Sequence, residues 1–197
     1  MKKRAIFLDR DGTINEDVGY PDNSGQIKIY PSSFEALAKI NASGFLAVII
    51  TNQSGIGRGY LTEDDLEEIH QKMRADFAGR GVHVDGVYFC PHYELSANPR
   101  YRKDCACRKP KPGLARRAAR DLGIDLAGSY FIGDKVEDVL FGLNIGARPV
   151  LVLTGFGAES RKKLGEMDIR PAHTAPDLLA AVDWILGQEH PQKNDPV

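Results

Sequence analysis

The sequence predicts an α/β protein built on a doubly wound parallel sheet. Candidate strands and helices alternate along most of the chain, and this order is typical of a parallel sheet covered by helices. The run FLAVIIT is continuously apolar, as expected for a strand that is buried on both faces. The chain has 197 residues, which is long enough for one domain with a substantial core.

Five strands and five helices are expected. The strands are expected at 4–9, 45–51, 84–90, 129–134 and 149–153. The helices are expected at 32–43, 62–80, 113–122, 136–145 and 176–187. Two stretches, 15–31 and 91–112, fit neither pattern, and long loops in a compact domain are usually functional or disordered.

Capping residues set the expected helix boundaries. Ser32 or Ser33 is the N-cap of the first helix, and Gly44 lies just past its end. The second helix begins with a capping box formed by Thr62 and Asp65. Its apolar face carries Leu66, Ile69, Met73 and Phe77. The last helix is expected to turn inward Leu178, Leu179, Val182, Ile185 and Leu186.

Composition argues against several classes of protein. The net charge of -1 gives no electrostatic footprint for nucleic acid or for an anionic membrane surface. No apolar run approaches the ~20 residues that a membrane span needs. The apolar stretch near the N-terminus is also too short for a signal peptide. We therefore expect a cytoplasmic protein without a nucleic-acid or membrane partner. We also expect a monomer, although neither composition nor motifs address the oligomeric state.

Acidic side chains follow two of the expected strands. Asp9 and Asp11 follow the first strand and Asp134 ends the fourth. Ligands of open α/β sheets bind outside the carboxyl ends of the strands, so these residues are expected to meet there. Like charges this close together need a cation between them. The sequence therefore predicts a site for Mg²⁺, which prefers oxygen ligands, at Asp9, Asp11 and Asp134.

Neighbouring polar groups favour a phosphate ligand at this site. Thr51 ends the second strand with a hydroxyl, and Lys109 supplies a positive charge in a Pro-rich turn. Gly12 allows a sharp turn whose backbone N–H groups face an anion. A lone Asp-Gly pair would be explained more simply as a turn. The ordered set FLDRDGT, TNQSGI, KPKPG and IGDKVED favours a phosphate site instead.

All three cysteines lie in one segment together with a histidine. The order is Cys90-x-His92, then twelve residues, then Cys105-x-Cys107. Three thiolates and one imidazole complete a tetrahedral structural Zn²⁺ site, and Zn²⁺ would order a loop with few apolar residues. The alternative is a buried strand cysteine beside a surface histidine. The loop leads directly into Lys109, so the zinc is expected to position catalytic residues.

The motifs FLDRDGT, Thr51, Lys109 and GDKVED resemble those of phosphatases of the haloacid dehalogenase (HAD) superfamily. The resemblance implies a Rossmann-like fold, with Asp9 as a nucleophile that forms an aspartyl-phosphate. It implies that Asp11 protonates the leaving oxygen and later activates water. Thr51 and Lys109 would stabilise charge on the phosphoryl group.

Asp11 must be protonated at neutral pH to act as an acid. Crowding by Asp9 and Asp134 is expected to raise its pKa, while Mg²⁺ keeps the other two ionised. The resemblance implies that Mg²⁺ binds Asp9, Asp134 and the backbone carbonyl of Asp11. Asp138 fits either a place behind the metal ligands or a solvated position in the first turn of its helix.

The zinc loop resembles a narrower branch of the superfamily, which contains heptose bisphosphate and histidinol-phosphate phosphatases. The long segment between His92 and Cys105 and the form CRKPKPG are closer to the heptose enzymes. This implies removal of the C7 phosphate of D-glycero-D-manno-heptose 1,7-bisphosphate in heptose biosynthesis. Histidinol phosphate or another small metabolite is the alternative substrate. The residues implied to bind substrate are Asp17, Val18, Gly19, Tyr20, Asn52, Gln53, Ser54, Arg108 and Lys135.

The resemblance leaves little sequence for a separate cap domain. We expect one domain over 1–188, with the zinc loop at 90–108, and a polar tail over 189–197. A non-catalytic zinc-binding module would leave the Asp9–Asp11 motif without a purpose. A DNA-end phosphatase would need a basic groove, which the near-neutral charge does not support. The preferred anomer and the roles of two arginines, at positions 10 and 58, stay open.

Overall fold

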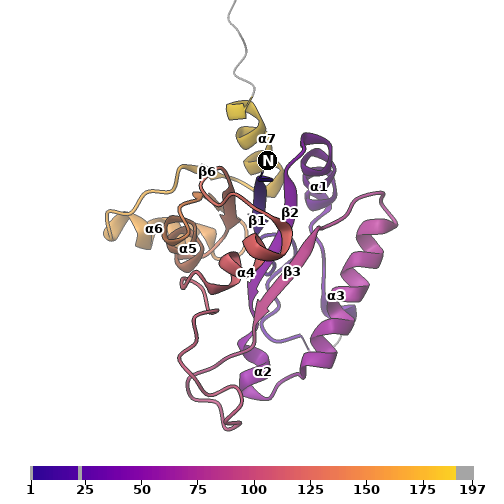
Figure 1. Ribbon diagram of the computed structural model, residues 1–197, viewed down its shortest axis with the longest axis vertical. Helices are drawn as coiled ribbons and strands as arrows, with labels where there is room; N and C mark the ends of the chain where they lie inside the picture. Colours follow the sequence, from indigo (N-terminus) through magenta and orange to yellow (C-terminus); the bar gives the residue numbers. More distant parts are fainter. Residues whose placement is uncertain (1, 22–23, 190–197) are drawn as a thin grey trace, which may run out of the picture.

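The computed structural model describes residues 2–21 and 24–189. Within them, six parallel strands form one sheet in the order β3-β2-β1-β4-β5-β6 (Figure 1). The strands are β1 (Ala5–Leu8), β2 (Leu46–Asn52), β3 (Gly86–Cys90), β4 (Tyr130–Gly133), β5 (Arg148–Val152) and β6 (His173–Ala175). The strand order reverses at β1, so the predicted doubly wound sheet is confirmed.

Helices cover both faces of this sheet (Figure 1). They are α1 (Pro31–Ser43), α2 (Ser54–Arg58), α3 (Glu63–Ala78), α4 (Gly113–Leu122), α5 (Val136–Asn144), α6 (Gly157–Glu166) and α7 (Leu178–Glu189), with a 3₁₀ turn at Ser24–Gln26. Ile6 and Leu8 pack with α1, α3 and α7, whereas Ala5 and Phe7 pack with α4 and α5. Alternate side chains of a strand face opposite sides, which explains why β1 is apolar throughout.

The start of α1 differs from the prediction. The N-cap is Tyr30, and Pro31 takes the first helical position, where its missing N–H costs nothing. The buried hydroxyl of Ser33 instead donates a hydrogen bond to the carbonyl of Ile14 at 2.8 Å. The end of α1 is as predicted, because Gly44 adopts a left-handed φ of 81°.

The amphipathic helices α3 and α7 bury the predicted faces. The capping box between Thr62 and Asp65 is present at the start of α3. The four predicted apolar residues of α3 are all buried: Leu66, Ile69, Met73 and Phe77. In α7 the predicted residues are buried or packed against the core: Leu178, Leu179, Val182, Ile185 and Leu186.

Besides the 3₁₀ turn at Ser24–Gln26, two α-helices and one strand were not predicted, namely α2, α6 and β6. The sequence of α2, SGIGR, is too short for a helical period and holds two glycines. The sequence of α6, GAESRKKLGE, is mostly polar and buries only Gly157, Ser160 and Leu164. Strand β6 has only three residues. Tertiary packing, rather than local pattern, forms these elements.

The helix α7 reaches Glu189, one residue past the predicted end of the domain. Glu189 accepts a hydrogen bond from the hydroxyl of Tyr130 at 3.0 Å and forms an ion pair with Arg4. The rest of the predicted tail, 190–197, lies outside the described residues. None of the helices in the described ranges is long and apolar enough to cross a membrane.

Candidate active site and zinc-binding cluster

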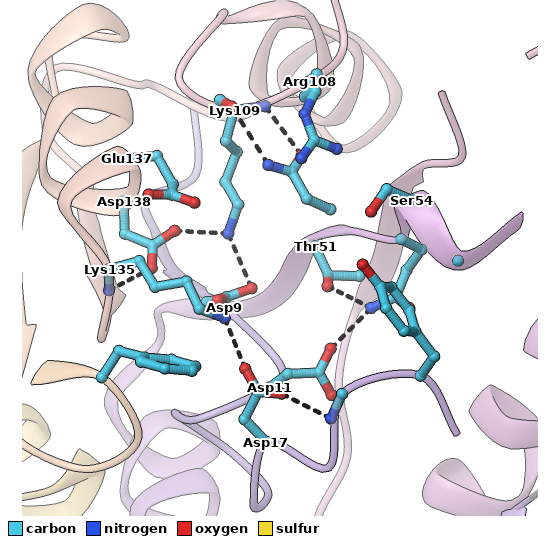
Figure 2. A pocket seen from close by; sticks show the side chains of 16 residues that line it. Asp9, Asp11, Asp17, Thr51, Ser54, Arg108, Lys109, Lys135, Glu137 and Asp138 are labelled. Atoms are coloured by element: carbon cyan, nitrogen blue, oxygen red, sulfur yellow. Dashed lines mark hydrogen bonds and ion pairs between the residues drawn. The ribbon is translucent and has the colours of Figure 1, made fainter. Parts of the chain in front are cut away.

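A cavity of about 270 Å³ opens at the carboxyl ends of the strands (Figure 2). Asp9 follows β1, and its N–H donates to the carbonyl of Ile132 in β4 at 2.9 Å, so the two strand ends are held together. The predicted residues that line the cavity are Asp9, Asp11, Asp17, Gly19, Tyr20, Thr51, Asn52, Gln53, Ser54, Arg108, Lys109 and Lys135. Val18 is not among its lining residues and is 40% exposed.

The ammonium of Lys109 lies between two buried carboxylates. Its Nζ is 2.8 Å from Asp9 Oδ1 and 2.6 Å from Asp138 Oδ1. Burial alone would lower the pKa of Lys109, but the charges of Asp138 and Asp9 raise it, so the ammonium keeps its proton. The side chain of Asn52 fixes the backbone of Lys109 from both sides, with hydrogen bonds of 3.0 and 3.2 Å. Asn52 therefore holds the backbone of Lys109 so that its ammonium points at Asp9.

Asp9, Asp134 and Asp138 form a cluster whose carboxylate oxygens lie within 4.8 Å of one another. Burial, followed by the charge of Asp9, raises the pKa of Asp134 to about 7 and that of Asp138 to about 6. The Oδ1 atom of Asp134 is buried and lacks a hydrogen-bond partner among the described residues. A Cβ on Gly12 would lie 2.2 Å from Asp134 Oδ2, so only glycine fits beside this carboxylate. Three buried carboxylates this close together, one of them with an unpaired oxygen, fit a hard divalent cation such as Mg²⁺.

The buried Asp138 is 1% exposed, which excludes the solvated position that the sequence left open. Its Oδ2 accepts a hydrogen bond from the backbone N–H of Lys135 at 3.0 Å, while its Oδ1 faces Lys109. Asp138 thus fixes both the start of α5 and the ammonium that faces Asp9.

The carboxylate of Asp11 is held by a buried arginine. Arg10 donates to Asp11 through Nε at 3.0 Å and through a terminal nitrogen at 2.8 Å. Asn15 and Gln53 donate two further hydrogen bonds, at 3.0 and 2.8 Å. Burial alone would raise the pKa of Asp11, but Arg10 and these hydrogen bonds lower it. The expectation that crowding raises the pKa of Asp11 is therefore wrong, because the charge of Arg10 and the hydrogen bonds to the carboxylate outweigh the effect of burial.

Arg10 is fully buried, and its Nη1 lies 3.4 Å from Nε2 of His70 in α3. Burial, followed by the charge of Arg10, lowers the pKa of His70 to about 3. His70 is therefore a neutral imidazole that faces a guanidinium. Sequence reasoning missed His70, although a histidine next to Ile69 on the apolar face of α3 was the available signal.

Charged side chains from distant segments meet at the rim of the cavity. Lys135, at the start of α5, lies 2.9 Å from Asp17 in the loop after β1. Asp17 also accepts a hydrogen bond from the N–H of Gly19 at 2.9 Å. Arg108 contacts the carbonyl of His92 at 3.5 Å. The rim therefore combines the β1 loop, the zinc loop and α5.

Three lining residues were not predicted: Gly55, Glu137 and Phe156. Phe156 follows β5 and is 49% exposed, and its N–H donates to Asp134 Oδ2 at 2.8 Å. The rule that strand ends converge applies to β5 as well as to β1, β2 and β4. Phe156 could have been found by extending that rule to the fifth strand.

The structure brings the four predicted zinc ligands together. The Sγ atoms of Cys90, Cys105 and Cys107 lie 3.2 to 3.5 Å apart, and His92 Nδ1 lies 3.1 Å from Cys107 Sγ. These cysteines are free, since a disulfide needs about 2.05 Å. A tetrahedral ion with Zn–S bonds of about 2.3 Å spaces its sulfurs about 3.8 Å apart, close to this arrangement. The donor set fits Zn²⁺.

Comparisons with known proteins agree with this geometry. The HAD-hydrolase-like family model matches residues 106–181. The chain is 47% identical over 154 residues to the D-glycero-beta-D-manno-heptose-1,7-bisphosphate 7-phosphatase of Pasteurella multocida. This match covers 78% of this chain and 83% of that protein. The chain is 39% identical over 184 residues to the protein of the same name from Escherichia coli, with coverages of 92% and 87%.

A solved structure extends the likeness to three dimensions. It is the D,D-heptose 1,7-bisphosphate phosphatase from B. bronchiseptica complexed with magnesium and phosphate. The two chains superpose with a TM-score of 0.83 and 33% identity, over 94% of this chain and 99% of the other. With this identity, coverage and fold, the chain belongs to the HAD-superfamily phosphatases, in the family that contains these heptose bisphosphate phosphatases.

Proposed function

We propose that this phosphatase removes the C7 phosphate of D-glycero-β-D-manno-heptose 1,7-bisphosphate through an aspartyl-phosphate on Asp9. The observation that carries the proposal is the pairing of buried Asp9 with Lys109 inside a carboxylate cluster, beside an open polar cavity. The names of the relatives support the substrate and the β anomer.

Asp9 and Asp134, with the backbone carbonyl of Asp11, would hold Mg²⁺. The unpaired Oδ1 of Asp134 and the excess of buried negative charge support this assignment. When bound, the cation would neutralise charge on the phosphoryl oxygens. Asp138 would stay outside the metal shell, because Lys109 and the first turn of α5 already engage its carboxylate.

Asp9 is the nucleophile. One carboxylate oxygen attacks phosphorus in line, and an Asp9–phosphorus bond forms as the bond from phosphorus to the C7 oxygen breaks. Lys109 and Thr51 donate hydrogen bonds to the phosphoryl oxygens. The hydroxyl of Thr51 already accepts a hydrogen bond from Gln53 Nε2 at 2.8 Å, so its own proton is left for the phosphate.

Asp11 moves the protons. It gives a proton to the departing C7 oxygen, and it then takes one from the water that attacks the aspartyl-phosphate, which releases inorganic phosphate and restores Asp9. Arg10 keeps Asp11 ionised before substrate binds, so Asp11 gains its proton on binding. A phosphate dianion beside Asp11 favours this, because a nearby like charge raises a carboxyl pKa.

Basic side chains at the rim suit the second phosphate. Arg108 presents a planar guanidinium, which binds phosphate oxygens in pairs. We assign to Arg108 the C1 phosphate, and to Lys135 a contact with substrate that replaces its ion pair with Asp17. The sugar would contact the remaining rim residues Asp17, Gly19, Tyr20, Asn52, Gln53 and Ser54.

The proposal extends to organisation and location. One domain over residues 1–188, extended by Glu189 at the end of α7, would carry the whole reaction, and the protein would act as a monomer. Three thiolates that share a zinc site are compatible with a reducing, cytoplasmic compartment. The net charge of -1 gives no reason to add a nucleic-acid partner.

Phosphate release with Mg²⁺ from a substrate panel tests the proposal. The panel holds both anomers of heptose 1,7-bisphosphate, histidinol phosphate and simple sugar phosphates. We expect the β anomer to give the highest kcat/KM. A higher value for histidinol phosphate, or equal values for all substrates, would overturn the substrate assignment and leave the Asp9 chemistry in place.

A further inference from the structure

The role of Arg58, the last residue of α2, is open in the proposed mechanism. Its guanidinium carbon lies 3.7 Å from the centre of the Tyr93 ring and 5.8 Å from that of Tyr20. Among the described residues, no carboxylate lies within ion-pair distance of Arg58. Its position is therefore set by two aromatic rings rather than by a salt bridge.

These two rings belong to different loops, the zinc loop and the loop after β1. Tyr93 follows the predicted zinc ligand His92 directly in the sequence, so it is part of the zinc loop. Tyr20 lies in the loop after β1 and lines the cavity. Arg58 therefore links the zinc loop to a residue that faces substrate.

The backbone of α2 is docked on the same zinc loop. The N–H of Gly57 donates to the carbonyl of Pro91 at 3.0 Å, and the N–H of Gln53 donates to the carbonyl of Cys90 at 2.8 Å. A Cβ on Gly57 would lie 2.8 Å from that Pro91 oxygen and 2.9 Å from the backbone nitrogen of Tyr93. This close approach requires glycine, and it sets the base of Arg58 against the loop that the zinc orders.

Tyr20 depends on α2 for its orientation. It is 47% exposed, and its ring centre lies 4.6 Å from that of Tyr60, which is itself 57% exposed. A Cβ on Gly55 would lie 3.0 Å from its ring, so the start of α2 also supports it. Because the Tyr20 ring is half exposed and has few packing contacts, one stacked guanidinium can influence its orientation.

We propose that Arg58 is a positioning residue that couples the zinc loop to Tyr20 and so fixes the wall of the cavity that receives the sugar. This inference rests on the proposed function for its substrate. The physical link from Tyr93 through Arg58 to Tyr20 is independent of which phosphate ester is hydrolysed.

The test compares Arg58→Ala and Tyr93→Ala with two controls in the full, zinc-loaded chain. Tyr93→Phe keeps the ring that stacks on Arg58. Arg80→Ala removes another exposed arginine, stacked 4.9 Å above the Phe34 ring, whose contact lies outside the cavity lining. Amide hydrogen exchange over residues 15–21 reports the order of the Tyr20 loop, and steady-state kinetics on the β bisphosphate report substrate binding.

Arg58→Ala and Tyr93→Ala are expected to speed exchange over 15–21 and to raise KM about two- to fivefold, the size of one exposed cation–π contact, with kcat within twofold. Adding Arg58→Ala to Tyr20→Ala should raise KM no further. Unchanged exchange over 15–21, or effects that multiply in the double variant, would overturn the coupling. If wild type hydrolyses another phosphate ester better, the proposed substrate fails, and the exchange experiment still decides the role of Arg58.

Discussion

Lys109 Nζ lies 2.8 Å from Asp9 Oδ1, and both side chains are at most 5% exposed. The pair places a permanent positive charge beside the oxygen that would attack phosphorus.

Asp9→Asn should abolish turnover and keep the fold. The amide cannot form an acyl phosphate, and we expect a loss of more than about a thousandfold in kcat. Because the change removes one of three crowded carboxylates, the thermal midpoint of the metal-free protein should not fall. Phosphate-release assays and thermal melts check both points. The matched control is Asp183→Asn, an exposed residue paired with Lys39; full activity in Asp9→Asn would contradict the covalent mechanism.

Lys109→Met should destabilise the protein as well as inactivate it. Removing the cation leaves Asp9 and Asp138 as buried carboxylates without their ion-pair partner, which costs about 3–5 kcal/mol in the free energy of unfolding. Denaturant titrations in the absence of Mg²⁺ measure this. Lys163→Met, which breaks an exposed pair with Glu159, should have a far smaller effect. Equal stability of the two variants would show that Lys109 does not neutralise the cluster.

The Cys₃His cluster should hold about one equivalent of Zn²⁺ per chain. His92→Ala should lose most of the zinc and lower the thermal midpoint, because the loop has few apolar residues to order it. His83→Ala, which changes an exposed histidine outside the cluster, should keep the zinc. Elemental analysis of protein purified without chelators decides the point, and absence of zinc there would remove the assignment.

His70 should make the protein less stable as the pH falls. Its folded pKa of about 3 lies below the unfolded value of 6.5, so the unfolded state binds more protons between these values. The contribution of His70 to the free energy of unfolding is then fully present well above pH 6.5. Protonation of this residue in the unfolded state lowers the free energy of unfolding by about 2 kcal/mol at pH 5. His70→Gln keeps an acceptor for Arg10 but does not titrate, so its stability should depend less on pH. Identical pH dependence of the two proteins in denaturant titrations would contradict this role.

The parts of the site that the sequence predicts are those fixed by topology. Asp9, Thr51 and Asp134 lie at or next to strand ends, and parallel strands bring these ends to one edge whatever the details of packing. The zinc ligands are predicted because four donors of the right type lie close together in the chain.

The parts that the sequence does not predict depend on tertiary packing. Arg10 could have faced solvent, and only its burial beside His70 in α3 turns it toward Asp11 and reverses the expected pKa shift. Likewise, α2 has no sequence signal of its own, because its contacts with the zinc loop are what form it.

The most direct test of the central claim is a ³¹P NMR time course with the β anomer of heptose 1,7-bisphosphate and Mg²⁺. The account predicts that one equivalent of inorganic phosphate appears while the anomeric C1 phosphate signal persists, and that Asp9→Asn leaves both signals unchanged. Loss of the C1 phosphate first, or no release from a protein that hydrolyses histidinol phosphate, would contradict it.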